Sequence, residues 1–349
     1  MKAVRANADH AAVIEECATP APGPGMTLIK TLKAGICGSD LHTVRRLQSG
    51  YAAVEIMLGH EVCGVVAERG DGVESAQVGD RVTVEPLHRC GRCVNCLAGR
   101  YNVCYEHEFV LGNYVDRPGG LAEYFEVPAY CLVPVLDTLS DDEGALVEPL
   151  AVGVHALKVA RPGFRPTVGV IGAGSIGLAV VMAAAAIGVP HIIVGARHQH
   201  QRDAAARLGA TGFIDTGGDT SEEALQEQLN GAPLPDIVVE TVGGAEETIN
   251  IAVNMVRPGG TVSMVGGYWQ TSNVNLETLL MKEVTLTASN CYSSGSGSSD
   301  FEDAMAIIAA NPRFVDTVLT HRFALDAATD AFQAALDKST GSIKVMLSP

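Results

Sequence analysis

Four cysteines lie within fifteen residues of this 349-residue chain, at Cys90, Cys93, Cys96 and Cys104. Two, two and seven residues separate them, which suits a zinc ion held by four thiolates with every coordination position filled. Such a closed site has no room for substrate, so we expect it to stabilise the lobe 89–105. The alternative is an iron–sulfur cluster, but its common bacterial spacing is two, two and three with a proline after the last cysteine, where Tyr105 stands here.

A second group of potential metal ligands precedes this lobe. The segments GICGSDLH and LGHE supply Cys37, His60 and Glu61, which offer one sulfur, one imidazole and one carboxylate. Each residue taken alone would more often be an ordinary core or surface residue. Together they provide three ligands and leave a fourth position open, which distinguishes catalytic from structural zinc. Glu148 is a fourth candidate, because a helix must break near Pro149 and the carboxylate can then point off the axis.

A dinucleotide-binding pattern occurs in the middle of the chain. Gly172, Gly174 and Gly177 form G-x-G-x-x-G directly after a run of Val and Ile, and an apolar helical segment follows. The glycines permit a tight turn and a close approach of backbone N–H groups to a pyrophosphate at a helix N-terminus. A tight strand-to-helix turn without a ligand is the alternative.

The next strand should end in an acidic residue if the cofactor is NAD. Ala196 occupies that position and Arg197 follows, so a guanidinium could instead bind the 2′-phosphate of NADP, which we favour over NAD. A solvated charge at the end of a strand would also explain Arg197. The other residues expected to contact the cofactor are Ser175, Ile176, Arg202, Val242, Val265 and Gly266.

The composition limits the classes of partner. The chain is 47% hydrophobic and 18% charged, and its length allows two domains with cores of their own. A formal net charge of −16 disfavours nucleic acid and anionic membranes. The N-terminus shows no apolar segment followed by a cleavage site, so we expect the protein in a reducing cytoplasm. In that compartment the nine cysteines indicate metal ligands or reactive thiols.

The order of short apolar segments predicts an α/β fold. The first 140 residues are rich in β-type segments, and a helix should begin after Ser140, which forms a capping box with Glu143, and kink at Pro149. From Val168 onward six strand-like segments alternate with helical ones, which is typical of a parallel sheet.

The uncharged segment from Val168 to Ala196 could be taken for a membrane span. Its glycines and Pro190 favour a strand, a turn, a buried helix and a second strand.

The motifs GICGSDLH, LGHE, the cysteine lobe, EPLAVGVHAL and GAGSIG occur in an order that resembles the zinc-dependent medium-chain dehydrogenase/reductase family over the whole chain. The resemblance implies a mostly β, GroES-like catalytic domain at 1–150 and 292–349, and a Rossmann domain with a doubly wound parallel sheet at 151–291. It also implies a homodimer or homotetramer, often joined through the last cofactor-domain strand, VTLTAS.

Glu61 beside His60, together with Glu148 in EPL, is similar to the polyol, butanediol and idonate dehydrogenase branch. The expected reaction is hydride transfer between a secondary alcohol or polyol, or the matching ketone, and a nicotinamide cofactor. Oxidation of an amino alcohol, as by L-threonine 3-dehydrogenase, ranks second. Another class of function is a metal or redox sensor that uses the cysteine lobe, but a sensor has no need for the second, open ligand set.

The resemblance also implies roles for individual residues. Cys37, His60 and Glu61 match the catalytic zinc ligands, and Glu148 matches a glutamate that binds zinc directly or through water, so that each chain would hold two zinc ions. Ser39 and His42 match a proton relay, and Asp40 matches the residue that fixes the tautomer of the zinc-bound histidine. A zinc ion with an open position lowers the pKa of a bound hydroxyl by several units.

Overall fold

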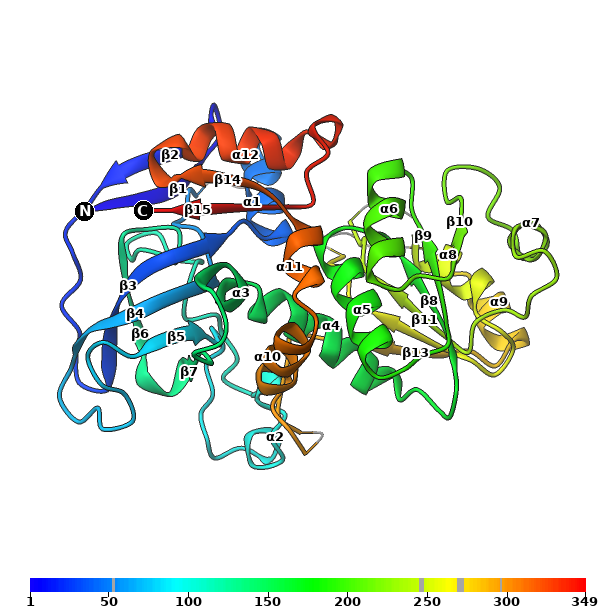
Figure 1. Cartoon of the computed structure of the whole chain (residues 1–349), viewed down its shortest axis with the longest axis horizontal. Coiled ribbons are helices and arrows are strands. Elements are labelled where there is room, and N and C mark those ends of the chain that lie inside the picture. Colours follow the sequence, from blue (N-terminus) through cyan, green and yellow to red (C-terminus); the bar gives the residue numbers. More distant parts are fainter. Residues whose placement is uncertain (52–53, 245–247, 269–272, 296) are drawn as a thin grey trace. The chain divides into compact units, whose positions relative to one another are not determined.

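The computed structural model describes residues 1–51, 54–244, 248–268, 273–295 and 297–349. The chain forms two compact units, shown in Figure 1. The first comprises Met1–Glu148 and Ile308–Pro349, and the second comprises Pro149–Ile307. The first unit is therefore discontinuous in sequence, because the C-terminal segment returns to the N-terminal sheet.

The first unit is built on a mostly antiparallel sheet with the strand order β14-β15-β3-β4-β5-β7, in which β6 also pairs with β3. A separate hairpin consists of β1 and β2. The C-terminal strand β15, red in Figure 1, pairs with the blue strand β3 at Gly35 and Met346. The strand bounds are β1 Lys2–Asn7, β2 Ala11–Glu16, β3 Met26–Gly35, β4 Glu61–Arg69, β5 Arg81–Val84, β6 Tyr124–Pro128, β7 Leu132–Pro134, β14 Leu319–Ala324 and β15 Lys344–Ser348.

Short helices surround this sheet. Ile29, Val62 and Phe125 from its strands pack in one apolar core with Phe332 of α12. The helix bounds are α1 Gly38–Gln48, α2 Val94–Leu97, α3 Asp141–Ala145, α11 Arg313–Val318 and α12 Ala328–Leu336, with short 3₁₀ helices η1 Tyr101–Val103, η2 Ala129–Cys131, η3 Leu325–Ala327 and η4 Lys338–Thr340.

The predicted capping box after Ser140 is present. The Ser140 hydroxyl accepts the N–H of Glu143, and the Glu143 carboxylate accepts the N–H of Ser140. The helix is interrupted at Leu146, so the kink predicted at Pro149 is wrong in position. Pro149 lies instead in the first turn of α4 (Val147–Ala160), where a missing N–H breaks no helical hydrogen bond.

The second unit contains a parallel sheet with the strand order β10-β9-β8-β11-β12-β13. Numbered within the unit this order is 3-2-1-4-5-6, the doubly wound arrangement, and its direction reverses between β8 and β11. The fold class predicted from the sequence is confirmed. The bounds are β8 Thr167–Ile171, β9 His191–Gly195, β10 Gly212–Ile214, β11 Ile237–Glu240, β12 Thr261–Met264, β13 Thr285–Ala288, α5 Ser175–Ala186, α6 Gln199–Leu208, α7 Glu222–Gln228, α8 Thr248–Met255, α9 Leu276–Met281 and α10 Asp300–Ala310.

The uncharged segment 168–196 folds as β8, α5 and β9. Every residue of α5 from Gly177 to Ala184 is buried, which explains its apolar composition without a lipid environment. Within the described parts of the chain, no helix has the length and apolar character needed to cross a membrane.

Candidate functional site

The four cysteines of the lobe gather at one point in the first unit. Their sulfur atoms all lie within 4.8 Å of one another, and the Cys90–Cys96 and Cys93–Cys104 sulfur pairs are each 3.9 Å apart. Four sulfurs at about 2.3 Å from a central zinc would be separated by about 3.8 Å. The geometry of the lobe therefore fits tetrahedral zinc.

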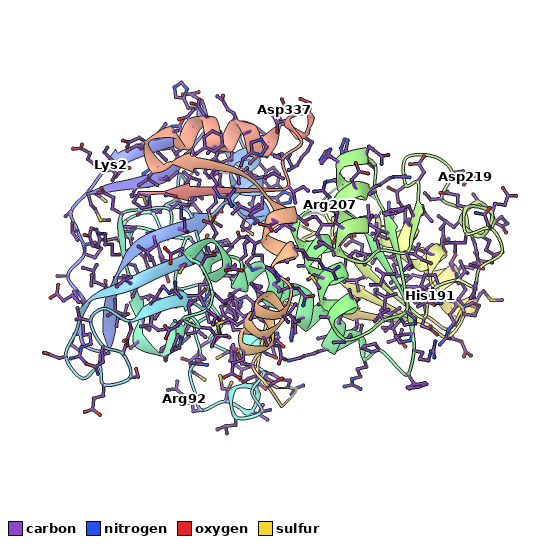
Figure 2. All side chains as sticks on the ribbon, in the orientation of Figure 1. Lys2, Arg92, His191, Arg207, Asp219 and Asp337 are labelled. Carbon is purple, nitrogen blue, oxygen red and sulfur yellow. The ribbon has the colours of Figure 1, made fainter. Side chains whose placement is uncertain are left out.

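Backbone N–H groups donate to the sulfur atoms of two of these cysteines. Cys93 precedes α2 and its sulfur accepts the N–H of Cys96, while the sulfur of Cys104 accepts the N–H groups of Cys90 and Glu106. Donation by the N–H groups of Cys96 and Tyr105 lowers the pKa of Cys93 to about 6. A thiol that ionises this readily is a better metal ligand. The lobe is at the surface, where Arg92 extends into solvent and pairs with Glu106 (Figure 2).

Cys37 and Asp40 occupy the start of α1. Cys37 is the N-cap residue, and its N–H donates to the Asp40 carboxylate at 2.9 Å. Asp40 is 2% exposed, and burial raises its pKa, opposed by the His60 charge and the Cys37 N–H. The other Asp40 oxygen lies 4.0 Å from Nδ1 of His60, which is longer than a hydrogen bond.

His60 lies among several anionic groups. Burial by itself lowers the pKa of His60, but the charges of Cys37, Asp40 and Glu148 and a hydrogen bond with Cys37 outweigh burial and raise it well above its usual value. A site that favours the cationic imidazole so strongly is one in which a metal cation would be stabilised. The chemistry of the donors, sulfur, imidazole and carboxylate, also suits zinc.

Glu61, another predicted ligand, has a cationic partner. It is fully buried at the start of β4, and both of its carboxylate oxygens accept hydrogen bonds from Lys344 Nζ at 2.6 Å. Among the described residues, the lobe cysteines are the only group of three or more potential ligands with all ligand atoms within 4.8 Å. The second group of predicted ligands therefore interacts electrostatically but does not form a closed coordination shell. Its members are Cys37, His60, Glu61 and Glu148.

The two predicted relay residues lie one turn apart on α1. Ser39 is exposed, whereas His42 is half-buried. Residues three positions apart share a helix face. Burial lowers the pKa of His42, and the nearby positive charge of Arg45 lowers it further.

The glycine pattern follows β8 at the point where the direction of the sheet reverses. Gly172 has φ +96°, and a Cβ there would lie 2.6 Å from a Val242 methyl carbon. A Cβ on Gly177 would lie 2.0 Å from the carbonyl oxygen of Gly172. Gly174, the N-cap of α5, faces open space, with no atom within 4 Å of an added Cβ. These three environments match the turn, helix-packing and pyrophosphate roles of such glycines.

The other predicted cofactor contacts also lie near the carboxyl ends of the parallel strands or at the start of α5. Ser175 and Ile176 begin α5, Val242 follows β11, and Val265 and Gly266 follow β12. This is the edge of a doubly wound sheet at which dinucleotides bind.

Near the end of β9, Ala196 is buried and Arg197 is exposed. The Arg202 guanidinium donates to the backbone oxygens of Ala196 and Ile214 at 3.0 and 3.3 Å. Arg202 thereby ties together the ends of β9 and β10 and holds the backbone next to Arg197.

Glu240 was not predicted from the sequence. Its side chain is fully buried at the end of β11, and one carboxylate oxygen accepts the N–H groups of Val242 and Gly243 and the hydroxyl of Thr248. Glu240 therefore shapes the loop that carries Val242. The available signal was a charged residue closing the apolar strand IVVE.

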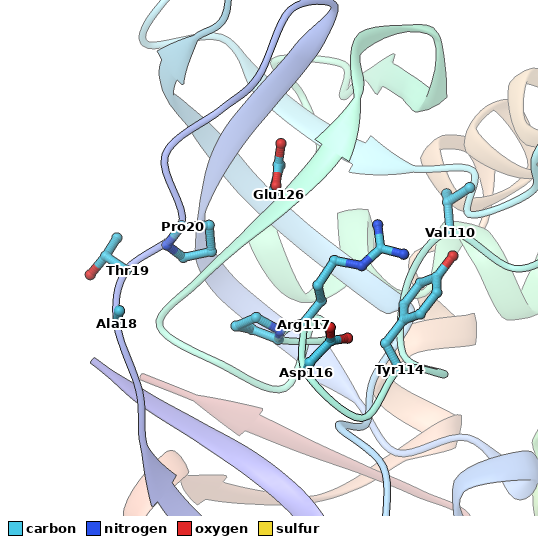
Figure 3. Close-up of a pocket in the computed structure, with 9 residues that line it drawn as sticks. Ala18, Thr19, Pro20, Val110, Tyr114, Asp116, Arg117 and Glu126 are labelled. Atoms are coloured by element: carbon cyan, nitrogen blue, oxygen red, sulfur yellow. The ribbon is translucent and has the colours of Figure 1, made fainter.

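A separate cavity of about 170 Å³ lies in the first unit (Figure 3). Neither cysteine nor histidine lines it. The Arg117 guanidinium lies 3.7 Å from the centre of the Tyr114 ring, and Glu126 accepts the N–H of Gly23. These polar groups support the surrounding loops.

Comparison with known proteins gives a consistent result. The family model "alcohol dehydrogenase GroES-like domain" matches residues 23–137, and "zinc-binding dehydrogenase" matches residues 175–310. Sorbitol dehydrogenase from Bacillus subtilis (strain 168) is 33% identical over 343 residues, which is 96% of this chain and 94% of the relative.

Two solved structures are similar over the whole chain. A zinc-binding dehydrogenase from Sinorhizobium meliloti 1021 bound to NADP has a TM-score of 0.85 and 30% identity, covering 100% of this chain and 99% of that one. A protein described as a short chain alcohol dehydrogenase, from Escherichia coli CFT073 and complexed with NADH, has a TM-score of 0.86 and 28% identity, with coverage of 100% and 99%.

A GroES-like unit with a cysteine lobe and a doubly wound dinucleotide-binding unit define the class of medium-chain dehydrogenases. The chain belongs to the zinc-dependent medium-chain dehydrogenase/reductase family, in its polyol dehydrogenase branch, and is a nicotinamide-dependent oxidoreductase. The family resemblance noted in the sequence is confirmed.

Proposed function

We propose that this enzyme transfers a hydride between a secondary alcohol or polyol, or the matching ketone, and NADP in preference to NAD. The similarity to sorbitol dehydrogenase supports a polyol substrate. The observation that carries the proposal is that the buried His60 lies beside the start of α1, with its Nδ1 4.0 Å from the Asp40 carboxylate and its side chain hydrogen-bonded to Cys37. This arrangement calls for a cation, and a zinc ion is the cation that fits these ligands.

Cys37, His60 and Glu61 would hold the catalytic zinc, with the Glu61 carboxylate released from Lys344, and Glu148 would bind the zinc directly or through water. When bound, zinc in such a site makes a substrate hydroxyl far more acidic. Asp40 lies on the Nδ1 side of His60, which leaves Nε2 as the nitrogen available to the metal. The four lobe cysteines would hold a second, structural zinc ion.

Ser39 and His42 would move the proton released by the substrate hydroxyl. Ser39 is exposed at the start of α1 and can act as the first acceptor. His42 lies one turn further along the same helix, and its lowered pKa keeps the imidazole neutral and able to accept a proton at neutral pH.

Arg197 would bind the 2′-phosphate of NADP. Its exposed position after β9, with a buried alanine where an NAD-binding acid is expected, supports this assignment. Gly174 would leave room for the pyrophosphate, and Ser175 and Ile176 would present their backbone N–H groups from the N-terminus of α5.

The enzyme would act as a homo-oligomer, either a dimer or a tetramer. The edge strand β13 has mostly exposed residues. Large apolar side chains are exposed on α9, the helix that precedes β13 in the sequence, with 72% of Leu276, 75% of Leu280 and 77% of Met281 accessible. An exposed edge strand and exposed apolar side chains are both suited to association with a second copy. A reducing cytoplasm would keep the lobe thiols available for zinc.

Replacement of the proposed zinc-ligand thiol tests the function. Cys37→Ser should lower the zinc content from two ions to one per chain and abolish polyol-dependent reduction of NADP. Cys17→Ser is the matched control, because Cys17 is also half-buried but belongs to neither cysteine group. Full activity in Cys37→Ser would refute the proposal.

Substrate and metal should be determined together. Activity would be measured with polyols, diols, sugar acids and threonine, each with NADP and NAD. We expect a colourless protein with two zinc ions and the highest activity on a polyol. A brown protein containing iron, without dehydrogenase activity, would support a sensor that uses the lobe.

A further inference from the structure

The contact between Glu61 and Lys344 joins two residues 283 positions apart in the sequence. Both side chains are buried, with 0% of Glu61 and 1% of Lys344 exposed. Lys344 Nζ donates to both Glu61 oxygens at 2.6 Å and to the backbone oxygen of Ile36 at 3.0 Å. An ammonium has three N–H groups, so all three are used.

The backbone around Glu61 is shaped for this position of its carboxylate. Gly35 pairs with Glu61 across β3 and β4, and a Cβ on Gly35 would lie 2.2 Å from a Glu61 carboxylate oxygen. The carboxylate can therefore lie beside Lys344 because residue 35 has no side chain. Ile36, whose oxygen Lys344 also binds, directly precedes Cys37.

We propose that Lys344 is a positioning residue that competes with the catalytic zinc for Glu61 and thereby sets how tightly the metal is held. This inference rests on the catalytic zinc site proposed above. A buried carboxylate is stabilised in its ionised form by a cationic partner. Lys344 supplies that partner before metal binds, and Glu61 leaves Lys344 for the zinc when metal binds.

The competition predicts that zinc affinity rises when the lysine charge is removed. In Lys344→Met the buried Glu61 loses its lysine partner and gains more from binding zinc, so the dissociation constant of the catalytic zinc should fall roughly tenfold or more. The metal-free protein should melt at a lower temperature than the wild type. In Lys344→Arg the guanidinium can hold both carboxylate oxygens, so zinc should bind more weakly than to the wild type.

A double-mutant cycle separates competition for Glu61 from simple repulsion between Lys344 and zinc. Zinc affinity would be measured by competition with a chromophoric chelator, with the lobe site assigned from the Cys37→Ser variant. We expect Lys344→Met to tighten zinc binding in the wild type but to change it less than threefold in Glu61→Gln. An equal gain in both backgrounds, or no gain in either, would overturn the inference.

Lys282→Met is the control for the loss of a buried lysine. Lys282 is 7% exposed and pairs with Glu222 at 2.8 Å in the second unit, so its replacement should lower the melting temperature without changing zinc affinity. If Lys344→Met does not fold, Lys344→Arg decides, and unchanged or tighter zinc binding there overturns the inference. A wild-type protein that binds zinc at the lobe alone would refute the proposed catalytic site itself.

Discussion

Two glycines of the dinucleotide-binding turn should respond differently to the same substitution. Gly172 has φ +96°, and an added Cβ would lie 2.6 Å from a Val242 methyl carbon and 2.9 Å from the Thr241 hydroxyl oxygen. A non-glycine residue in such a backbone conformation costs about 1–3 kcal/mol, and overpacking costs a further 1–3 kcal/mol or so. We therefore expect Gly172→Ala to destabilise the protein by roughly 2–6 kcal/mol.

Gly174→Ala adds the same methyl group in a different environment. Gly174 has φ −76°, and no atom lies within 4 Å of the added Cβ. The loss of a glycine N-cap costs about 0.5–1 kcal/mol. The methyl group would nevertheless occupy the space into which the pyrophosphate must come, so we expect the dissociation constant of NADPH to rise about tenfold, equivalent to about 1.4 kcal/mol.

Thermal unfolding without cofactor and a fluorescence titration with NADPH measure these two effects. A change of 1 kcal/mol shifts the melting temperature of a domain of this size by about 2–4 °C. Gly172→Ala should lower the melting temperature at least twice as far as Gly174→Ala does. A lower melting temperature for Gly174→Ala than for Gly172→Ala, or wild-type affinity of Gly174→Ala for NADPH, would refute the roles assigned to these two glycines.

Three further predictions concern the metal lobe, the cofactor and the proton relay. Cys93→Ser should remove one zinc ion per chain and lower the melting temperature by several degrees, and an unchanged zinc content would contradict the lobe assignment. Arg197→Gln should raise KM for NADP about tenfold or more while changing KM for NAD little, since hydrogen bonds to charged groups contribute about 1.5–3 kcal/mol. Equal changes in KM for both cofactors would exclude a contact between Arg197 and the 2′-phosphate. Arg45→Gln should move the acidic limb of the pH–rate profile for alcohol oxidation upward by about 0.2–0.5 pH units, because Arg45 disfavours the protonated form of His42. The shift should vanish in a His42→Gln background, and a downward shift would refute the role of this histidine.

The sequence alone determined those features that depend on short stretches of chain. The cysteine spacing of the lobe, the glycine pattern after β8 and the Ser140 capping box are local, and each constrains the backbone within a few residues. The alternation of strands and helices likewise predicted the parallel sheet, because hydrophobic periodicity reports directly on burial. The predicted position of the helix kink was less accurate. The kink was predicted at Pro149, but the helix is interrupted at Leu146.

The tertiary structure decided what each polar group of the site contacts. Lys344 reaches Glu61 because β15 returns to pair with β3, and the register of that pairing cannot be read from either strand alone. Glu240 serves the loop after β11, and Arg202 binds two strand ends instead of extending into solvent. Buried charges find their partners across the fold, so their roles depend on distances that no local pattern encodes.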